Sequence, residues 1–99
     1  MKVTFVQSGG VAGLVKGCEL DTTTLSKDAG EELERLARAA ALPQSGTYLS
    51  AAGRDLMTYE VTIEDGKTTT AVVMDDSTLP ATAKPLVALA KKHAKPQKP

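Results

Sequence analysis

A chain of 99 residues with a formal net charge of zero, 41% hydrophobic and 24% charged side chains has the composition of one ordinary globular domain. This composition excludes a disordered chain and a membrane-embedded one. The aromatic side chains are only Phe5, Tyr48 and Tyr59, which argues against a base-stacking surface for nucleic acid and predicts a core of aliphatic residues.

The first two predicted elements are strands of a hairpin. Residues 2–7 alternate, with Val3 and Phe5 on one face, as in a half-buried strand. Residues 14–20 also alternate, although Lys16 falls on the apolar side. The connecting stretch is Ser8-Gly9-Gly10-Val11-Ala12-Gly13, in which glycines at three of six positions permit positive φ angles. This pattern predicts a hairpin with a long, shaped loop.

An amphipathic helix is expected next, over residues 27–41. Ser26 suits its N-cap, and acidic residues follow in the first turns, where the helix dipole favours them. The apolar residues that share one stripe, and should cover a sheet, are Ala29, Leu33, Leu36, Ala37 and Ala40. Residues 42–56 then form a loop longer than most connections in a compact domain, which is either functional or loosely ordered.

The second half repeats the order of hairpin and helix. Residues 57–64 alternate cleanly and residues 67–74 are rich in threonine and valine, while Asp65-Gly66 between them is typical of a tight hairpin turn. Pro85 suits the first turn of a second helix that continues to Ala94. The expected fold is therefore α+β, in the order ββαββα. Two hairpins form an antiparallel sheet with both helices packed on one face. Residues 1–95 make up the domain and residues 96–99 a short basic, proline-containing tail.

The sequence offers no set of catalytic or metal-binding residues. Nucleophilic catalysis needs a nucleophile, a base and an orienting group within reach of one another, and nothing pairs the single histidine, His93, with the single cysteine, Cys18. One cysteine allows neither an internal disulfide nor a cysteine-pair zinc site, so Cys18 is expected to be a buried structural thiol. Asp75-Asp76 lacks the glycine-punctuated acidic loop of a calcium site and is better explained as a cap on the following turn. We expect no enzymatic activity, no cofactor and no bound metal.

Charge is unevenly distributed along the chain. Residues 1–83 carry seven basic and twelve acidic groups, and residues 84–99 carry five lysines and no acid. A basic C-terminal segment can contact nucleic acid, but lysines at a helix end without arginine or aromatic neighbours more often complement the helix dipole. No apolar run has the length of a signal peptide or a spanning helix. We expect a cytoplasmic protein with neither a nucleic-acid nor a membrane partner.

Several short stretches of the chain stand in a characteristic order and spacing. They are Val3–Gly13, Leu20-Asp21, Tyr59-Glu60-Val61, Asp75–Pro80, and Lys84-Pro85-Leu86 with Leu89. Together they resemble the emfourin family, small bacterial inhibitors of protealysin and related thermolysin-like metalloproteases. The resemblance covers roughly residues 2–90, and its most distinctive part is the SGGxAG stretch.

The resemblance implies a competitive proteinaceous inhibitor that occupies the substrate cleft of a zinc metalloprotease, whose zinc belongs to the enzyme. It places the protease-binding residues in one loop, with Leu14 the candidate for the enzyme's apolar pocket: Ser8, Gly9, Gly10, Val11, Ala12, Gly13 and Leu14. A loop pinned between two strands loses little entropy on binding, which is consistent with this role.

Two alternatives stay open on the residues alone. Residues 42–56 match the family weakly, so they are either a second contact or an unrelated insertion. The glycine-rich loop also fits a plain hairpin without a partner. The alternative function is a non-catalytic interaction or regulatory module with an unknown protein partner.

Overall fold

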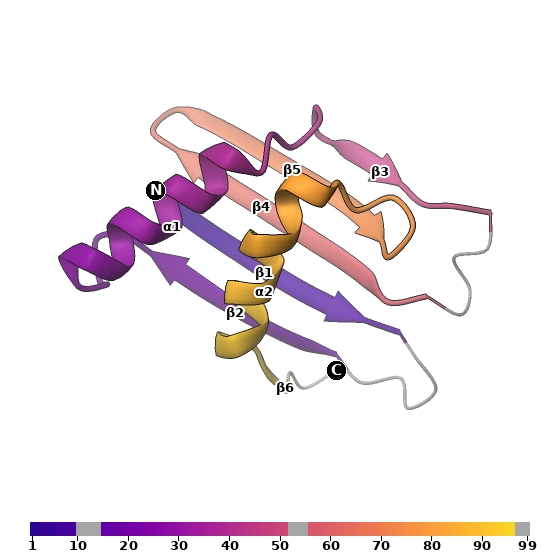
Figure 1. Ribbon diagram of the computed structural model, residues 1–99, viewed down its shortest axis with the longest axis horizontal. Helices are drawn as coiled ribbons and strands as arrows, with labels where there is room; N and C mark the ends of the chain where they lie inside the picture. Colours follow the sequence, from indigo (N-terminus) through magenta and orange to yellow (C-terminus); the bar gives the residue numbers. More distant parts are fainter. Residues whose placement is uncertain (10–14, 52–55, 97–99) are drawn as a thin grey trace.

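The computed structural model describes residues 1–9, 15–51 and 56–96. They form a six-stranded sheet in the order β3-β5-β4-β1-β2-β6, with the two helices on one face (Figure 1). The elements in chain order are β1 (Lys2–Ser8), β2 (Lys16–Asp21), α1 (Lys27–Ala39), β3 (Gly46–Tyr48), β4 (Thr58–Asp65), β5 (Thr68–Asp75), the short 3₁₀ helix η2 (Ala81–Ala83), α2 (Lys84–His93) and β6 (Lys95–Pro96).

Strand β1 lies between β2 and β4 and pairs with both in antiparallel fashion. Its Phe5 lies opposite Cys18 on β2 and Val61 on β4. The alternation of Val3 and Phe5 therefore points both side chains at the helices, and each is 1% exposed. The ring of Phe5 stacks on that of Tyr59 with 6.1 Å between centroids. As expected from the composition, the rest of the core is aliphatic apart from Met74.

Helix α1 begins as the sequence predicts. The Ser26 side chain accepts a hydrogen bond from the backbone N–H of Ala29 at 3.2 Å, which confirms the N-cap. The helix ends at Ala39, two residues earlier than predicted, and Ala41 takes a positive φ of 47°. A residue in this left-handed region is a common way to end a helix. Leu33 of the predicted stripe is completely buried.

The β4–β5 hairpin confirms the strongest local prediction, with one correction at the turn. Asp65 pairs with Thr68, so Gly66 and Lys67 form the two-residue loop, instead of Asp65 and Gly66. Gly66 has a φ of 63° and Lys67 has no positive φ, as in a type II′ turn, which needs a glycine at its first central position.

The ββαββα order was incomplete, because the sheet contains two further short strands. Strand β3 lies inside the predicted loop over residues 42–56 and pairs in parallel with β5, so the sheet is mixed and not purely antiparallel. Strand β6 pairs Lys95 and Pro96 with the outer edge of β2. Strands of three and two residues are too short for an alternation to be recognised, and the proline of β6 is tolerated because it lies on an edge strand. Among the described residues, no helix has the length and apolar character needed to cross a membrane.

Candidate functional site

One end of the sheet gathers the segments that adjoin the predicted contact loop. Gln7 of β1 pairs with Lys16 at the start of β2 and with Tyr59 near the start of β4. Tyr59 pairs in turn with Met74 near the end of β5, and Met74 with Tyr48 at the end of β3. These five residues make one row across five strands. We call this row and the residues beyond it the loop end of the sheet, which lies on the right in Figure 1.

The structure describes two of the seven predicted contact residues. Ser8 closes β1 opposite Thr58, and Gly9 follows it in an exposed position. The other five lie outside the described residues: Gly10, Val11, Ala12, Gly13 and Leu14. The chain returns to the sheet at Lys16, which pairs with Gln7. Both flanks of the predicted loop are therefore held by antiparallel strand pairs.

Gly9 occupies a position that only glycine fits comfortably. Its φ is 107°, a backbone conformation that residues other than glycine rarely adopt. A Cβ atom there would lie 3.0 Å from the carbonyl oxygen of Leu56 and 3.7 Å from the Cα atom of Met57. The backbone at the base of the loop thus packs directly on the backbone that leads into β4.

Asp75, at the end of β5, is a completely buried acid. Its Oδ2 accepts hydrogen bonds from the backbone N–H of Ser50 at 2.7 Å and from the hydroxyl of Ser50 at 2.9 Å. Its Oδ1 accepts from the backbone N–H groups of Ser77 and Thr78 at 2.8 and 3.0 Å. The Ser50 N–H, more than any other donor, holds the pKa of the Asp75 carboxyl below its ordinary value. The predicted capping of the following turn is confirmed.

Asp76, the next residue, binds the start of β4. Its Oδ1 accepts a hydrogen bond from the hydroxyl of Tyr59 at 2.6 Å, and its Oδ2 accepts from the backbone N–H of Met57 at 3.2 Å. Two consecutive aspartates thereby fix Ser50 and Met57, which flank positions 52–55. Because Gly9 packs against Met57, the support extends to the base of the predicted contact loop. Sequence reasoning assigned these aspartates a local cap and missed their long-range partners.

Tyr59 connects this network to helix α2. The ammonium group of Lys91 lies 3.3 Å from the Tyr59 hydroxyl and 5.0 Å from the centre of its ring. Burial, with a contribution from the carboxylate of Asp76, raises the pKa of Tyr59 to about 12. The hydroxyl therefore keeps its proton, and its hydrogen bond to Asp76, throughout the neutral range.

This shift predicts a specific alkaline behaviour. The folded pKa of Tyr59, about 12, lies above the ordinary value of 10.0, so its contribution to stability is complete below pH 10 and is lost as the pH rises through about 12. The difference between the phenolate absorbance titrations of the wild type and Tyr59→Phe should show this late ionisation. An ordinary titration of Tyr59 in protein that circular dichroism shows to be folded would contradict it.

The described residues hold no group of three or more side chains able to ligate a metal ion. His93 is exposed in the last turn of α2, as expected of a surface residue at a helix end. The thiol of Cys18 is half-buried and donates a hydrogen bond to the carbonyl oxygen of Ala90 at 3.4 Å. Cys18 is therefore less buried than predicted, but this partial burial raises the pKa of its thiol, which makes it a poor nucleophile.

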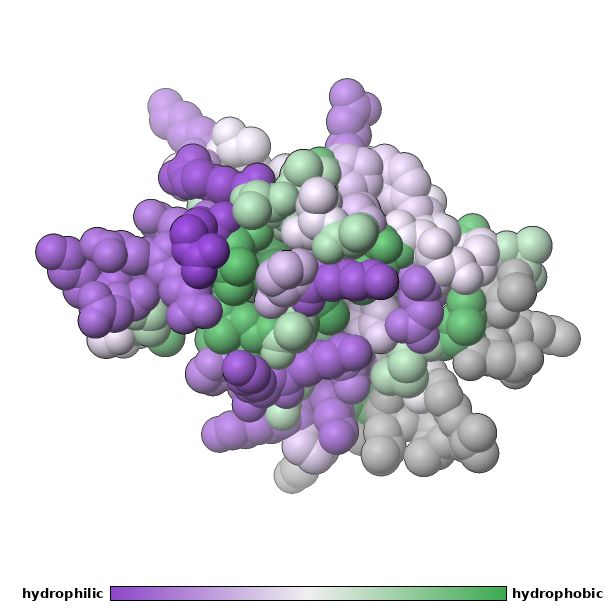
Figure 2. Space-filling view, viewed as in Figure 1, coloured by the Kyte–Doolittle hydropathy of each residue, from purple (hydrophilic) through white to green (hydrophobic). Residues whose placement is uncertain are grey.

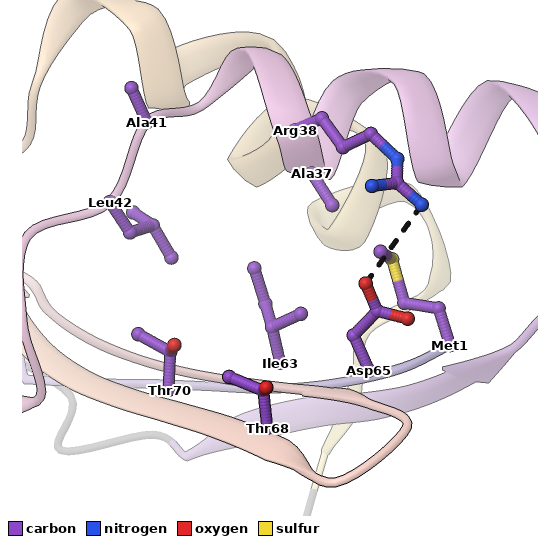
Figure 3. Close-up of a pocket in the computed structure, with 9 residues that line it drawn as sticks. All are labelled: Met1, Ala37, Arg38, Ala41, Leu42, Ile63, Asp65, Thr68 and Thr70. Atoms are coloured by element: carbon purple, nitrogen blue, oxygen red, sulfur yellow. Dashed lines mark ion pairs between the residues drawn. The ribbon is translucent and has the colours of Figure 1, made fainter.

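Surface hollows lie at both ends of the sheet. One, of about 280 Å³, lies between α1 and the β4–β5 hairpin, with Ile63 and Leu42 among its apolar lining and an ion pair of 3.9 Å between Arg38 and Asp65 across it (Figure 3). It is at the end of β4 and β5 opposite the loop end. Another, of about 320 Å³, lies beside Tyr59 and α2. The second hollow is lined by the hydrogen-bonded pair Tyr59 and Asp76 and by Lys91.

Two residues of the loop end were missed by sequence reasoning. Tyr48 and Leu49 are 37% and 51% exposed, and they are the large hydrophobic side chains that the described part of the chain leaves at the surface. Their stretch has no alternation that would have separated an exposed leucine from a buried one.

Comparison with known proteins adds one finding. The family model described as Emfourin matches residues 5–91 of the chain, a span that includes the whole predicted contact loop, all of α1 and most of α2. No curated protein and no solved structure gives a match.

Proposed function

The chain belongs to the emfourin family of metalloprotease inhibitors, and we propose that it blocks the substrate cleft of a thermolysin-like zinc metalloprotease with the loop end of its sheet. The family match over residues 5–91 is the observation that carries this proposal. The inhibitor acts by binding alone. The catalytic zinc is the enzyme's, and the bound loop keeps substrate away from it.

The loop from Ser8 to Leu14 is the proposed contact. Its support comes from the ordered flanks, since Ser8 pairs with Thr58 and Lys16 pairs with Gln7. A segment whose two ends are fixed by strand pairs loses less conformational freedom on binding than a free peptide does. In the proposed complex Val11 and Leu14 supply the apolar side chains, and the glycines allow the backbone to approach the enzyme closely.

Titration of a thermolysin-like protease with the purified protein tests this function. Activity against a fluorogenic peptide should fall in proportion to added protein, reach zero near equimolar ratio, and recover as substrate is raised, because the two compete for one cleft. The added protein should stay intact on a gel. A combined Gly10→Ser and Val11→Ser variant should lose inhibition while its circular dichroism is unchanged, and Lys67→Ser, at the opposite end of the sheet, serves as control.

Two results would contradict different parts of the proposal. Full activity of several such proteases at large excess of the protein would exclude the inhibitor and leave an interaction module with another partner. Full inhibition by the loop variant would keep the inhibitor but remove the loop from the contact.

A further inference from the structure

The exposed pair Tyr48 and Leu49 lies at the same end of the sheet as the proposed contact loop. Tyr48 ends β3 in the row that also contains Gln7 of β1, and Leu49 follows beyond the row just as Ser8 and Gly9 do. Strand β3 is separated from β1 by β5 and β4, which at the usual strand spacing is about 14 Å. One partner surface of ordinary size spans that distance.

The backbone that carries this pair is fixed on both sides. The hydroxyl of Thr78 donates a hydrogen bond to the carbonyl oxygen of Tyr48. The N–H and hydroxyl of Ser50 donate to the buried carboxylate of Asp75. The phenol of Tyr48 donates to the carbonyl oxygen of Gln44 at 2.7 Å. Leu49 is therefore displayed by an ordered backbone, and little freedom remains to be lost when a partner covers it.

Two long uncharged stretches of the chain meet at this end, although Lys16 and Asp76 also lie there. The two longest stretches without a charged residue are residues 3–15 and 39–53. The first contains the contact loop and the second contains Tyr48 and Leu49, so the topology brings both to the loop end. Figure 2 shows pale and green side chains at the upper right of the molecule, in the region of β3, and purple ones at the opposite end, over α1. The centres of protein interfaces are depleted of charged residues and enriched in aromatic ones.

We propose that Tyr48 and Leu49 form a second contact with the metalloprotease, in which Leu49 enters an uncharged, apolar recess beside the substrate cleft. This inference rests on the proposed function. The partner is the same enzyme, because an enzyme surface of ordinary size that contacts the loop also reaches β3, about 14 Å from β1. The exposed half of the Leu49 side chain does not stabilise the fold, whereas a bound enzyme would remove it from water.

The variant Leu49→Ser tests the second contact. Burial of the exposed part of a leucine side chain corresponds to about a tenfold change in affinity, so the inhibition constant should rise about tenfold. The melting temperature should stay at the wild-type value, because Leu49 is 51% exposed. Lys67→Ser, exposed in the turn at the far end of the sheet, should leave both quantities unchanged.

The outcomes separate this inference from the proposed function. If the wild type inhibits and Leu49→Ser inhibits equally well, the second contact is wrong and the inhibitor stands. If the wild type inhibits no metalloprotease, both are wrong. If Leu49→Ser leaves inhibition intact but converts a dimer into a monomer on size exclusion, the pair contacts a second copy of the chain, and the inference is again overturned. A further variant combines Leu49→Ser with the Gly10 and Val11 substitutions and is assayed at concentrations where inhibition is partial. The two increases in the inhibition constant should multiply, because the contacts are separate.

Discussion

Replacing Asp75 with alanine should lower the melting temperature by at least about 10 °C. The carboxylate is completely buried and accepts four hydrogen bonds, from the N–H and hydroxyl of Ser50 and from the N–H groups of Ser77 and Thr78. An alanine leaves these donors without their acceptor, and a buried donor that loses its partner costs more than the bond itself contributed. The loss also releases the residues after β3 from the end of β5.

Thermal and urea unfolding followed by circular dichroism measure this effect. Asp65→Ala is the matched control, because Asp65 is a half-exposed aspartate whose ion pair with Arg38 spans 3.9 Å, and its removal should change the melting temperature little. A melting temperature of Asp75→Ala close to that of the wild type would show that water replaces the carboxylate at no cost, which contradicts its burial.

The same carboxylate gives the stability a defined acid dependence. Its folded pKa lies below the ordinary value of 3.8, so its stabilising effect is present above that value and is lost as the pH falls through the lower folded pKa. The gap between the melting temperatures of the wild type and Asp75→Ala should therefore be widest near neutral pH and narrow only below about pH 4. Narrowing at higher pH would show that the Asp75 carboxyl is not held in its ionised form.

Most of the fold was predictable from the sequence because its main elements are long enough to show a period. The alternation in β1 and β4, the glycine turn between β4 and β5 and the apolar stripe of α1 each agree with the structure to within one or two residues. The helix ends were less accurate. Helix α1 ends at Ala39, two residues early, and the left-handed φ of 47° at Ala41 is unusual for an alanine and has no local signal.

What the sequence could not show depends on contacts between distant residues. Strand β3 has three residues, all exposed, and exists because it pairs with β5, about twenty-six positions later in the chain. The role of Asp75 likewise depends on Ser50, which a local motif cannot reveal. Pairings of this kind are set by the assembled sheet and not by local propensity.

The candidate site also has parts that the sequence predicts and parts that depend on contacts between distant residues. The family resemblance predicted a contact loop from Ser8 to Leu14, and the sequence alone indicated that it joins two strands. The position of Leu49 at the same end of the sheet as that loop required the strand order β3-β5-β4-β1, because nothing in the sequence says which end of which strand β3 adjoins. The charge-free stretches were visible beforehand, but their meeting at one end of the sheet was not.

Replacing Gly9 with alanine should raise the inhibition constant at least about tenfold. The new Cβ would lie 3.0 Å from the carbonyl oxygen of Leu56 at a φ of 107°, so the base of the loop must shift and its preorganised shape is lost. Inhibition assays with a thermolysin-like protease, accompanied by melting curves, measure the effect.

Gly66→Ala is a closely matched control for this change. Gly66 also has a positive φ, 63°, but a Cβ there meets nothing within 4 Å, and the residue lies in the turn at the opposite end of the sheet. Both variants carry the backbone cost of an alanine at positive φ, on the order of 1 kcal/mol, but only Gly9→Ala disturbs the proposed contact. If the two variants are destabilised alike and inhibit alike, the base of the loop plays no part in binding. If Gly9→Ala alone loses inhibition, the loss follows from the shape of the loop and not from an alanine at positive φ as such, since the control shares that backbone cost.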